Sequence, residues 1–194
     1  MQGIMRRIGV LGGLFDPPHW GHVLVARQAK QTQKYVDDVW IMPVYKHPWR
    51  DAAAPADNRL EMVRRAFEPE FHVDLSEFNH KKTSFTIDTV CLLKKKYPND
   101  TFKWIIGSDG LQSLTKWHKY DELVKDMSFL VFPRAGFPAE KSVGHAHLFN
   151  EPDLIISNCS SSLVRHRIRQ RLSISRIVPE AVMSYISAHH LYEQ

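Results

Sequence analysis

The chain has 194 residues, of which 43% are hydrophobic and 24% charged, with a formal net charge of +5 and two cysteines. These are ordinary values for a globular protein, so we expect a single domain over residues 1–194. The positive charge is modest and is not gathered into a dense stripe of Lys and Arg, which argues against a nucleic-acid partner. The apolar run after Arg6 and Arg7 is short and broken by glycines, and two cysteines are too few for a disulfide framework. We therefore expect neither a secretory signal nor a membrane span, and a cytoplasmic location.

Short apolar strands alternate with helical segments, which is typical of a parallel sheet covered by helices on both faces. We expect strands at residues 8–11, 39–42, 72–75, 102–106, 129–132 and 154–156. We expect helices at residues 21–34, 57–67, 85–97, 111–114, 120–125, 162–171 and 180–189. Stretches that contain Pro and Gly predict loops over residues 43–55 and 135–152, and the second loop would cover part of a ligand site.

The predicted fold class is α/β, a Rossmann-like, doubly wound parallel sheet with helices on both faces. It would form a single domain whose C-terminal helical part covers about residues 157–194. Ligands of such sheets bind beyond the carboxyl ends of the strands, and each motif described below follows a predicted strand.

The first motif joins the first predicted strand to the first predicted helix. Gly12 and Gly13 can adopt backbone angles that other residues resist, and they have no side chain to block a close ligand. Asp16, followed by two prolines, predicts the helix start, because aspartate caps helices and proline suits their first turn. His19 and His22 would then lie about one turn apart on one helical face. A helix N-terminus with two imidazoles suits a polyphosphate, since its N–H groups and dipole favour anions.

Two other interpretations of the histidine pair stay open. The pair could be an ordinary surface feature, or it could be half of a metal site. A structural zinc site is disfavoured because Cys91 and Cys159 are distant in sequence and no third ligand has zinc-like spacing.

Residues 12–22 read Gly-Gly-Leu-Phe-Asp-Pro-Pro-His-Trp-Gly-His. This run resembles the signature of nucleotidyltransferases that carry an H-x-G-H motif, and within them it most resembles nicotinate (or nicotinamide) mononucleotide adenylyltransferases. The resemblance covers about residues 6–192. It implies that the ATP site includes the residues Gly12, Gly13, Phe15, His19 and His22, with the two histidines at the α-phosphate and its bridging oxygen.

A second motif follows the predicted strand at residues 154–156. Serines at the start of the next helix would cap its N–H groups or bind an anion, and Ser161 and Arg165 would share a helical face. The guanidinium group of Arg can donate two parallel hydrogen bonds to phosphate oxygens. The alternative is a serine that only caps the helix, beside an Arg that is exposed to solvent. The segment resembles the family pattern I-S-x-T-x-x-R, with Ser162 where threonine is usual. The resemblance implies that Ser161, Ser162 and Arg165 bind the β- and γ-phosphates.

A third motif, residues 107–117, follows the strand at residues 102–106 and resembles the family segment G-x-D-x-L-x-x-L-x-x-W. A carboxylate just past a strand end can accept hydrogen bonds from ribose hydroxyls, and a Trp ring can stack on a base. The resemblance implies Asp109 on the adenosine side and Trp117 near the nicotinate ring. The alternatives are a helix N-cap for Asp109 and ordinary core packing for Trp117.

The residues implied in acceptor binding are Ser84, Phe85, Thr86, Arg50 and Trp117. Ser84, Phe85 and Thr86 resemble the family's S-Y-T-x-x-T segment at a helix start, where free N–H groups would bind the carboxylate or amide of a pyridine nucleotide. A simple Ser84 cap is the alternative. Residues 43–50 depart from the family pattern P-x-x-x-P-P-H-K, but Arg50 keeps its positive charge. Residues 58–63 and 178–182 fit family helices and are interpreted as packing elements.

The resemblance implies an enzyme of pyridine nucleotide (NAD) biosynthesis that transfers an adenylyl group from ATP to nicotinate or nicotinamide mononucleotide and releases pyrophosphate. Its catalytic residues would be His19, His22 and Arg165. Mg²⁺ would arrive with ATP and would not be bound by protein side chains alone. Three alternatives stay open: an adenylyltransferase for another phosphorylated acceptor such as phosphopantetheine, a cytidylyltransferase, and a non-catalytic nucleotide-binding domain. The choice between nicotinate and nicotinamide and the oligomeric state, including a homo-oligomer, also stay open.

Overall fold

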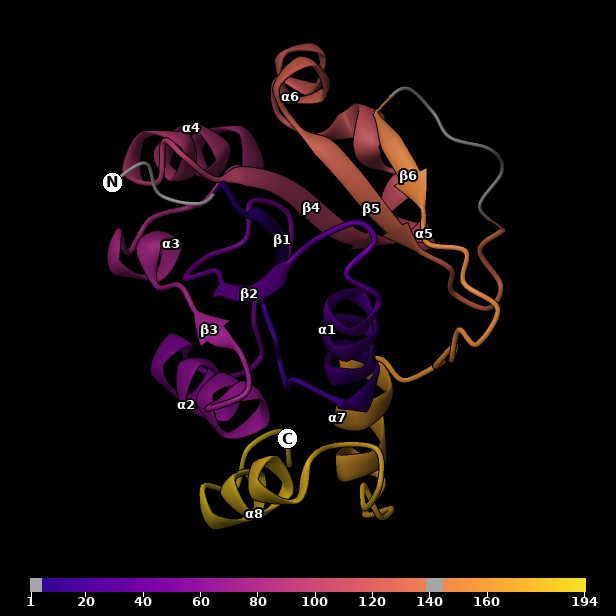
Figure 1. The fold of residues 1–194 in the computed structure, drawn as a ribbon. Helices are drawn as coiled ribbons and strands as arrows, with labels where there is room; N and C mark the ends of the chain where they lie inside the picture. The colour runs from indigo at the N-terminus through magenta and orange to yellow at the C-terminus, as the bar shows by residue number, and fades with distance from the viewer. Residues whose placement is uncertain (1–4, 139–144) are drawn as a thin grey trace.

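The computed structural model describes residues 5–138 and 145–194, and it contains one six-stranded parallel sheet (Figure 1). The strands are β1 (Arg7–Gly13), β2 (Asp38–Pro43), β3 (His72–Val73), β4 (Thr101–Gly107), β5 (Ser128–Phe132) and β6 (Ala146–Leu148). Their order in the sheet is β3-β2-β1-β4-β5-β6, and every neighbouring pair is parallel. This order is that of a doubly wound sheet and confirms the predicted fold class.

The helices are α1 (Trp20–Thr32), α2 (Ala56–Phe67), α3 (Ser76–Asn79), α4 (Thr86–Lys96), α5 (Ser108–Leu111), α6 (Tyr120–Asp126), α7 (Ser161–Arg169) and α8 (Glu180–Ala188), with a 3-10 turn η1 (Leu114–Lys116). Most agree with the predicted helices to within a few residues. The short α3 was not predicted. The helix predicted at residues 111–114 is wrong, because α5 ends at Leu111 and η1 begins at Leu114.

Both faces of the sheet are buried, because apolar side chains alternate between them along the central strands. In β4, Trp104 and Ile106 pack with α4 and α6 on one face, while Ile105 packs with α1 and α2 on the other. Helices therefore cover both faces, as Figure 1 shows.

The strand predicted at residues 154–156 is wrong. Ile155 and Ile156 are 60% and 51% exposed, and this segment is irregular. The side-chain amide of Gln28 in α1 satisfies the backbone of Ile155: its oxygen accepts from the N–H at 2.7 Å and its nitrogen donates to the carbonyl at 3.1 Å. The segment therefore needs no neighbouring strand for its hydrogen bonds.

The sixth strand is instead β6, which lies inside the loop predicted over residues 135–152 and pairs with residues 129–131 of β5. Three residues are too few to show strand periodicity in a sequence. Part of this predicted loop, residues 139–144, lies outside the described residues. The strand predicted at residues 72–75 is observed only over His72–Val73.

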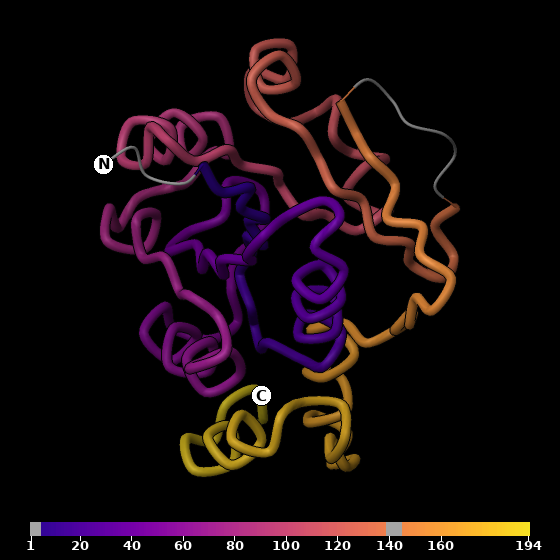
Figure 2. Tube along the Cα trace, in the orientation of Figure 1, coloured from indigo at the N-terminus to yellow at the C-terminus, as the bar shows by residue number. Residues whose placement is uncertain are grey.

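The two C-terminal helices form a third apolar cluster at the end of α2. Val164 of α7, Val182 of α8 and Tyr192 pack there with Met62 of α2. The first N–H of α1, at Trp20, donates to the carbonyl of Ile177 at 3.0 Å, so the C-terminal part lies against the start of α1 (Figure 2). This docking brings α7 to the carboxyl end of β1.

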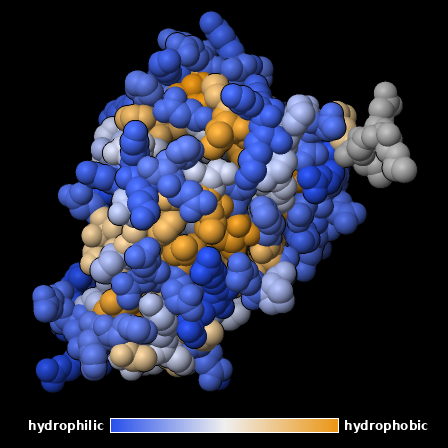
Figure 3. Space-filling view, turned by 90° about the vertical axis from the view of Figure 1, so that its left-hand side faces the viewer, coloured by the Kyte–Doolittle hydropathy of each residue, from blue (hydrophilic) through white to orange (hydrophobic). Residues whose placement is uncertain are grey.

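The side of the molecule that Figure 3 presents is mainly hydrophilic, with an apolar patch near its centre. None of the helices in the described part of the chain has the length and hydropathy needed to cross a bilayer.

Candidate active site

The chain crosses from one half of the sheet to the other between β1 and β4, and the predicted phosphate motif lies at their carboxyl ends. Gly12 and Gly13 are the last residues of β1 and continue the strand, so they do not use the unusual backbone angles that the sequence led us to expect. A Cβ on Gly12 would lie 2.6 Å from the Trp104 ring of β4. Gly12 is therefore required by strand packing. The residue in the left-handed region is Phe15, at φ 48°.

Asp16 is not the cap of α1, contrary to the sequence prediction. Its carboxylate is 3% exposed and accepts hydrogen bonds from the backbone N–H groups of Ala53 and Ala54 at 2.6 and 3.1 Å. Helix α1 begins at Trp20, with His19 as its N-cap. The aspartate therefore joins the loop after β1 to the loop after β2.

His19 and His22 lie together, as their spacing predicts. Their rings are stacked with centroids 3.7 Å apart, and the edge of the Phe15 ring lies against His22 at a centroid distance of 5.0 Å. The Nδ1 of His22 accepts a hydrogen bond from the backbone N–H of His19 at 3.3 Å. A neutral His22 therefore carries its proton on Nε2, where it can donate to a ligand.

Burial is the main cause of depressed pKa values at both imidazoles. It lowers the pKa of His22 to about 3, with a further contribution from the positive charge of Arg134. It lowers the pKa of His19 well below its ordinary value, with contributions from His22 and Arg134. Both rings are therefore neutral at pH 7 in the absence of an anion, and each offers one N–H donor.

Helix α7 reaches the same loop, although it lies far away in sequence. Ser161 Oγ donates to the carbonyl of Pro17 at 2.8 Å, and Arg165 Nη1 donates to the carbonyl of Asp16 at 2.6 Å. The predicted shared face of Ser161 and Arg165 is thus confirmed. Ser160 is the N-cap of α7 and accepts from Leu163 N–H at 3.1 Å. Ser162 Oγ lies 3.4 Å from Arg165 Nη2.

Asp109 lies in the first turn of α5 and forms an ion pair with Arg134, whose Nη1 is 2.9 Å from Asp109 Oδ2. The N-cap of α5 is Gly107, so the alternative role of Asp109 as a helix cap is not observed. Arg134 also donates to the carbonyl of Cys159 at 3.4 Å and so connects the ends of β4 and β5 to the start of α7.

Arg134 was missed by the sequence interpretation. Its available signal was its position two residues after the strand predicted at residues 129–132, where ligand-binding side chains are expected in this fold.

The predicted acceptor residues gather around the start of α4, with one exception. Phe85 is the N-cap of α4 and contributes no side-chain cap, so the alternative of a Ser84 cap is wrong. The Phe85 ring lies 4.4 Å from the His118 ring, and the neighbouring Trp117 is half-buried with its ring edge-on to Phe129 at 6.2 Å. Ser84 N–H donates to the carbonyl of Lys46 at 3.2 Å, which ties the β2–α2 loop to this helix start.

The exception is Arg50, which is exposed on the β2–α2 loop.

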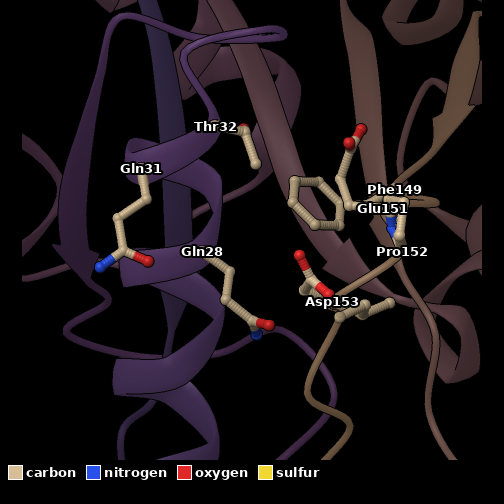
Figure 4. A pocket seen from close by; sticks show the side chains of 8 residues that line it. Gln28, Gln31, Thr32, Phe149, Glu151, Pro152 and Asp153 are labelled. Carbon is tan, nitrogen blue, oxygen red and sulfur yellow. The ribbon is translucent and has the colours of Figure 1, made fainter.

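A cavity of about 230 Å³ lies between the second half of α1 and the segment after β6, lined by Gln28, Thr32, Phe149 and Glu151 among others (Figure 4). It contains none of the predicted site residues. Within residues 5–138 and 145–194, no three His, Cys, Asp or Glu side chains form a group that could hold a metal ion.

Comparisons with known proteins identify the family of this chain. Residues 10–167 match the Cytidylyltransferase-like family. The chain is 39% identical to a protein of Bacillus pumilus named a probable nicotinate-nucleotide adenylyltransferase, and 36% identical to the nicotinate-nucleotide adenylyltransferase of Bacillus subtilis; each match covers 97% of this chain and 100% of the relative.

Among solved structures, the fold is similar to that of Plasmodium falciparum nicotinic acid mononucleotide adenylyltransferase complexed with NaAD. The TM-score is 0.83 at 22% identity, and the match covers 97% of this chain and 98% of the other. A structure of the same Plasmodium protein complexed with APC matches with a TM-score of 0.80 at 22% identity, with the same coverage. The chain therefore belongs to the nicotinate-nucleotide adenylyltransferases, a family of nucleotidyltransferase enzymes.

Proposed function

We propose that this protein transfers the adenylyl group of ATP to the phosphate of nicotinate mononucleotide. The products are pyrophosphate and the dinucleotide of nicotinate and adenine, an intermediate of NAD biosynthesis. The observation that carries the proposal is that the N-termini of α1 and α7 lie side by side. Ser161 donates to the carbonyl of Pro17 and Arg165 donates to the carbonyl of Asp16, in the loop that leads to His19. The names of full-length relatives support nicotinate as the acceptor.

In this reaction an oxygen of the acceptor phosphate forms a bond to the α-phosphorus of ATP. The bond from that phosphorus to the bridging oxygen breaks, and pyrophosphate leaves with the electron pair. The attacking phosphate is already anionic at pH 7, so the step needs no general base. Holding two polyanions in the reactive orientation can contribute roughly 7–11 kcal/mol.

The neutral imidazoles of His19 and His22 are assigned to the α-phosphate and its bridging oxygen. Their N–H donors lie in a buried setting, where charge that develops on the phosphate gains more stabilisation than it would in water. Ser161, Ser162 and Arg165 are assigned to the β- and γ-phosphates, because they lie at the N-terminus of α7 beside the histidine loop.

The adenosine half of ATP is assigned to Asp109, with Arg134 as an added candidate. Arg134 forms an ion pair with Asp109, and its positive charge lowers the pKa of both His19 and His22. It is therefore placed to neutralise the phosphates as well as to orient the carboxylate. Gly12, Gly13 and Phe15 are also assigned to the ATP site, since the Phe15 ring lies against His22 and the two glycines precede it at the end of β1.

The acceptor is assigned to the N-terminus of α4, at Ser84, Phe85 and Thr86, where no side chain caps the helix. The Ser84 N–H already donates to the carbonyl of Lys46, so the donors offered to the acceptor would be the N–H groups that follow it. Trp117 would flank the pyridine ring, and Arg50 would approach from the exposed loop.

Mg²⁺ is proposed to enter with ATP. The ion would be held largely by phosphate oxygens and water, as is usual for Mg²⁺. When bound, it neutralises part of the triphosphate charge.

The test is a turnover panel with ATP, Mg²⁺ and one acceptor at a time: nicotinate mononucleotide, nicotinamide mononucleotide, phosphopantetheine, or none. Pyrophosphate release only with nicotinate mononucleotide, or far faster with it, supports the proposal. Preference for phosphopantetheine, preference for CTP over ATP in a parallel series, or absence of turnover with every acceptor would each reject it.

A further inference from the structure

The carboxylate of Asp16 joins four parts of the chain next to the phosphate site. Its Oδ2 accepts from Ala53 N–H at 2.6 Å, and its Oδ1 accepts from Ala54 N–H at 3.1 Å and from the Tyr192 hydroxyl at 2.7 Å. Arg165 Nη1 lies 3.8 Å from Oδ2. The loop after β1, the loop after β2, α7 and the C-terminal segment thus meet at one buried charge.

Arg165 contacts Asp16 at two points, the backbone carbonyl and the carboxylate. The guanidinium donates from Nη1 to the Asp16 carbonyl at 2.6 Å and lies within ion-pair distance of the Asp16 carboxylate. Among the residues that the structure describes, its other terminal nitrogen has only the 3.4 Å contact with Ser162. The Nη1 side of the guanidinium is therefore held by Asp16, and the Nη2 side can donate to phosphate oxygens.

Tyr192 is held firmly enough to act on Asp16. Its side chain packs in the third apolar cluster with Met62, Val182 and Ile186. The preceding Leu191 N–H donates to the carbonyl of Ile186 at 3.1 Å, which folds the chain back from the end of α8 (Figure 2). Burial and the neighbouring Asp16 charge raise the pKa of Tyr192, so its hydroxyl stays protonated and donates.

We propose that Tyr192 is a positioning residue for ATP: its hydroxyl holds the Asp16 carboxylate, and Asp16 in turn holds Arg165 and the loop that leads to His19. This inference rests on the proposed function, because it assigns Arg165 to the triphosphate. It implies that the last residues of the chain contribute to nucleotide binding although they do not touch the nucleotide.

The central test compares Tyr192→Phe with Tyr185→Phe. Each variant loses one hydroxyl in the C-terminal part, but the Tyr185 hydroxyl contacts the Asn58 amide at 3.3 Å, away from Asp16. Since a hydrogen bond to a charged group is involved, we expect Tyr192→Phe to raise KM for ATP about tenfold. We expect KM for nicotinate mononucleotide to stay within about twofold, and Tyr185→Phe to change neither value.

Asp16→Asn provides a second route should Tyr192→Phe fold poorly. It keeps the size of the side chain, removes its charge and replaces one of the two acceptor oxygens with an NH₂ group, and we expect the same selective loss for ATP. The double variant should be no worse than Asp16→Asn alone, because both substitutions break one chain of contacts.

Equal increases in both KM values, or a lower melting temperature with unchanged KM for ATP, would overturn the proposal in favour of a purely structural role. Calorimetric titration with ATP alone separates this result from failure of the proposed function. If the wild type binds ATP but does not turn over, weaker ATP binding by Tyr192→Phe still supports the positioning role. If the wild type does not bind ATP, both proposals fail.

Discussion

Glu77 allows a quantitative test of how the acceptor side is built. The side chain belongs to α3, is 4% exposed and lies under the first turns of α4, where its Oε1 accepts from the Thr89 hydroxyl. Within the described residues its Oε2 has no hydrogen-bond partner. Burial raises the pKa of Glu77 from 4.5 to about 7. Glu77→Gln keeps the size of the side chain and removes this titration.

The expected effect on stability follows from the difference between the pKa of Glu77 in the native state and its pKa in the unfolded state. The native pKa exceeds the unfolded value by about 2.5, so the native state binds more protons between these two pH values. At about 1.36 kcal/mol per pKa unit, this corresponds to about 3 kcal/mol. This stabilisation is fully present below pH 4.5 and is lost as the pH rises through about 7.

The assay is urea unfolding of the wild type and Glu77→Gln at intervals from pH 5 to pH 8. Relative to the variant, the wild type should lose up to about 3 kcal/mol of unfolding free energy over this range. Glu122→Gln, which removes an exposed carboxylate of α6, is the matched control and should leave the wild-type slope unchanged. Parallel curves for the wild type and Glu77→Gln would refute the reasoning.

Three further substitutions test the phosphate site. His22→Ala should retain the melting temperature but lose about 2.7–4 kcal/mol of transition-state stabilisation, or roughly 100- to 1,000-fold in kcat; wild-type rates of pyrophosphate release would contradict its role. Arg165→Ala should raise KM for ATP more than KM for the mononucleotide, and equal increases would reject the assignment. Gly12→Ala should cost about 1–3 kcal/mol in thermal unfolding, because its Cβ would lie 2.6 Å from the Trp104 ring; an unchanged melting temperature would show that this strand pair relaxes freely.

The helices and central strands could be predicted because their signals are local. Short, nearly continuous apolar runs mark β1, β2, β4 and β5, as expected for strands buried on both faces of a parallel sheet, and longer helical segments separate most of them. β6 could not be predicted in the same way, since three residues carry no usable period. Residues 154–156 are apolar enough for a strand, but the Gln28 side chain, far away in sequence, bonds the backbone N–H and carbonyl of Ile155.

Residues 58–63 were interpreted as a packing element, but Arg59 shows what such an interpretation leaves out. Its guanidinium is buried and donates to the carbonyls of Leu14, Val44 and Tyr45 at 2.6–2.8 Å. It therefore joins the loops that follow β1 and β2. No sequence pattern around Arg59 indicates these partners, because a buried Arg and a solvated Arg occupy the same kind of helical position.

The sequence by itself determined the order of strands and helices and the pairing of His19 with His22, since these depend on neighbours within a few residues. Only the tertiary structure decided that Asp16 accepts hydrogen bonds from Tyr192 and Arg165 instead of capping α1. It also decided that Arg134 forms an ion pair with Asp109. Such partners lie up to 176 positions apart, and their contact depends on where the C-terminal helices dock against α2. Burial at those contacts then sets the charge of the site, which no local pattern encodes.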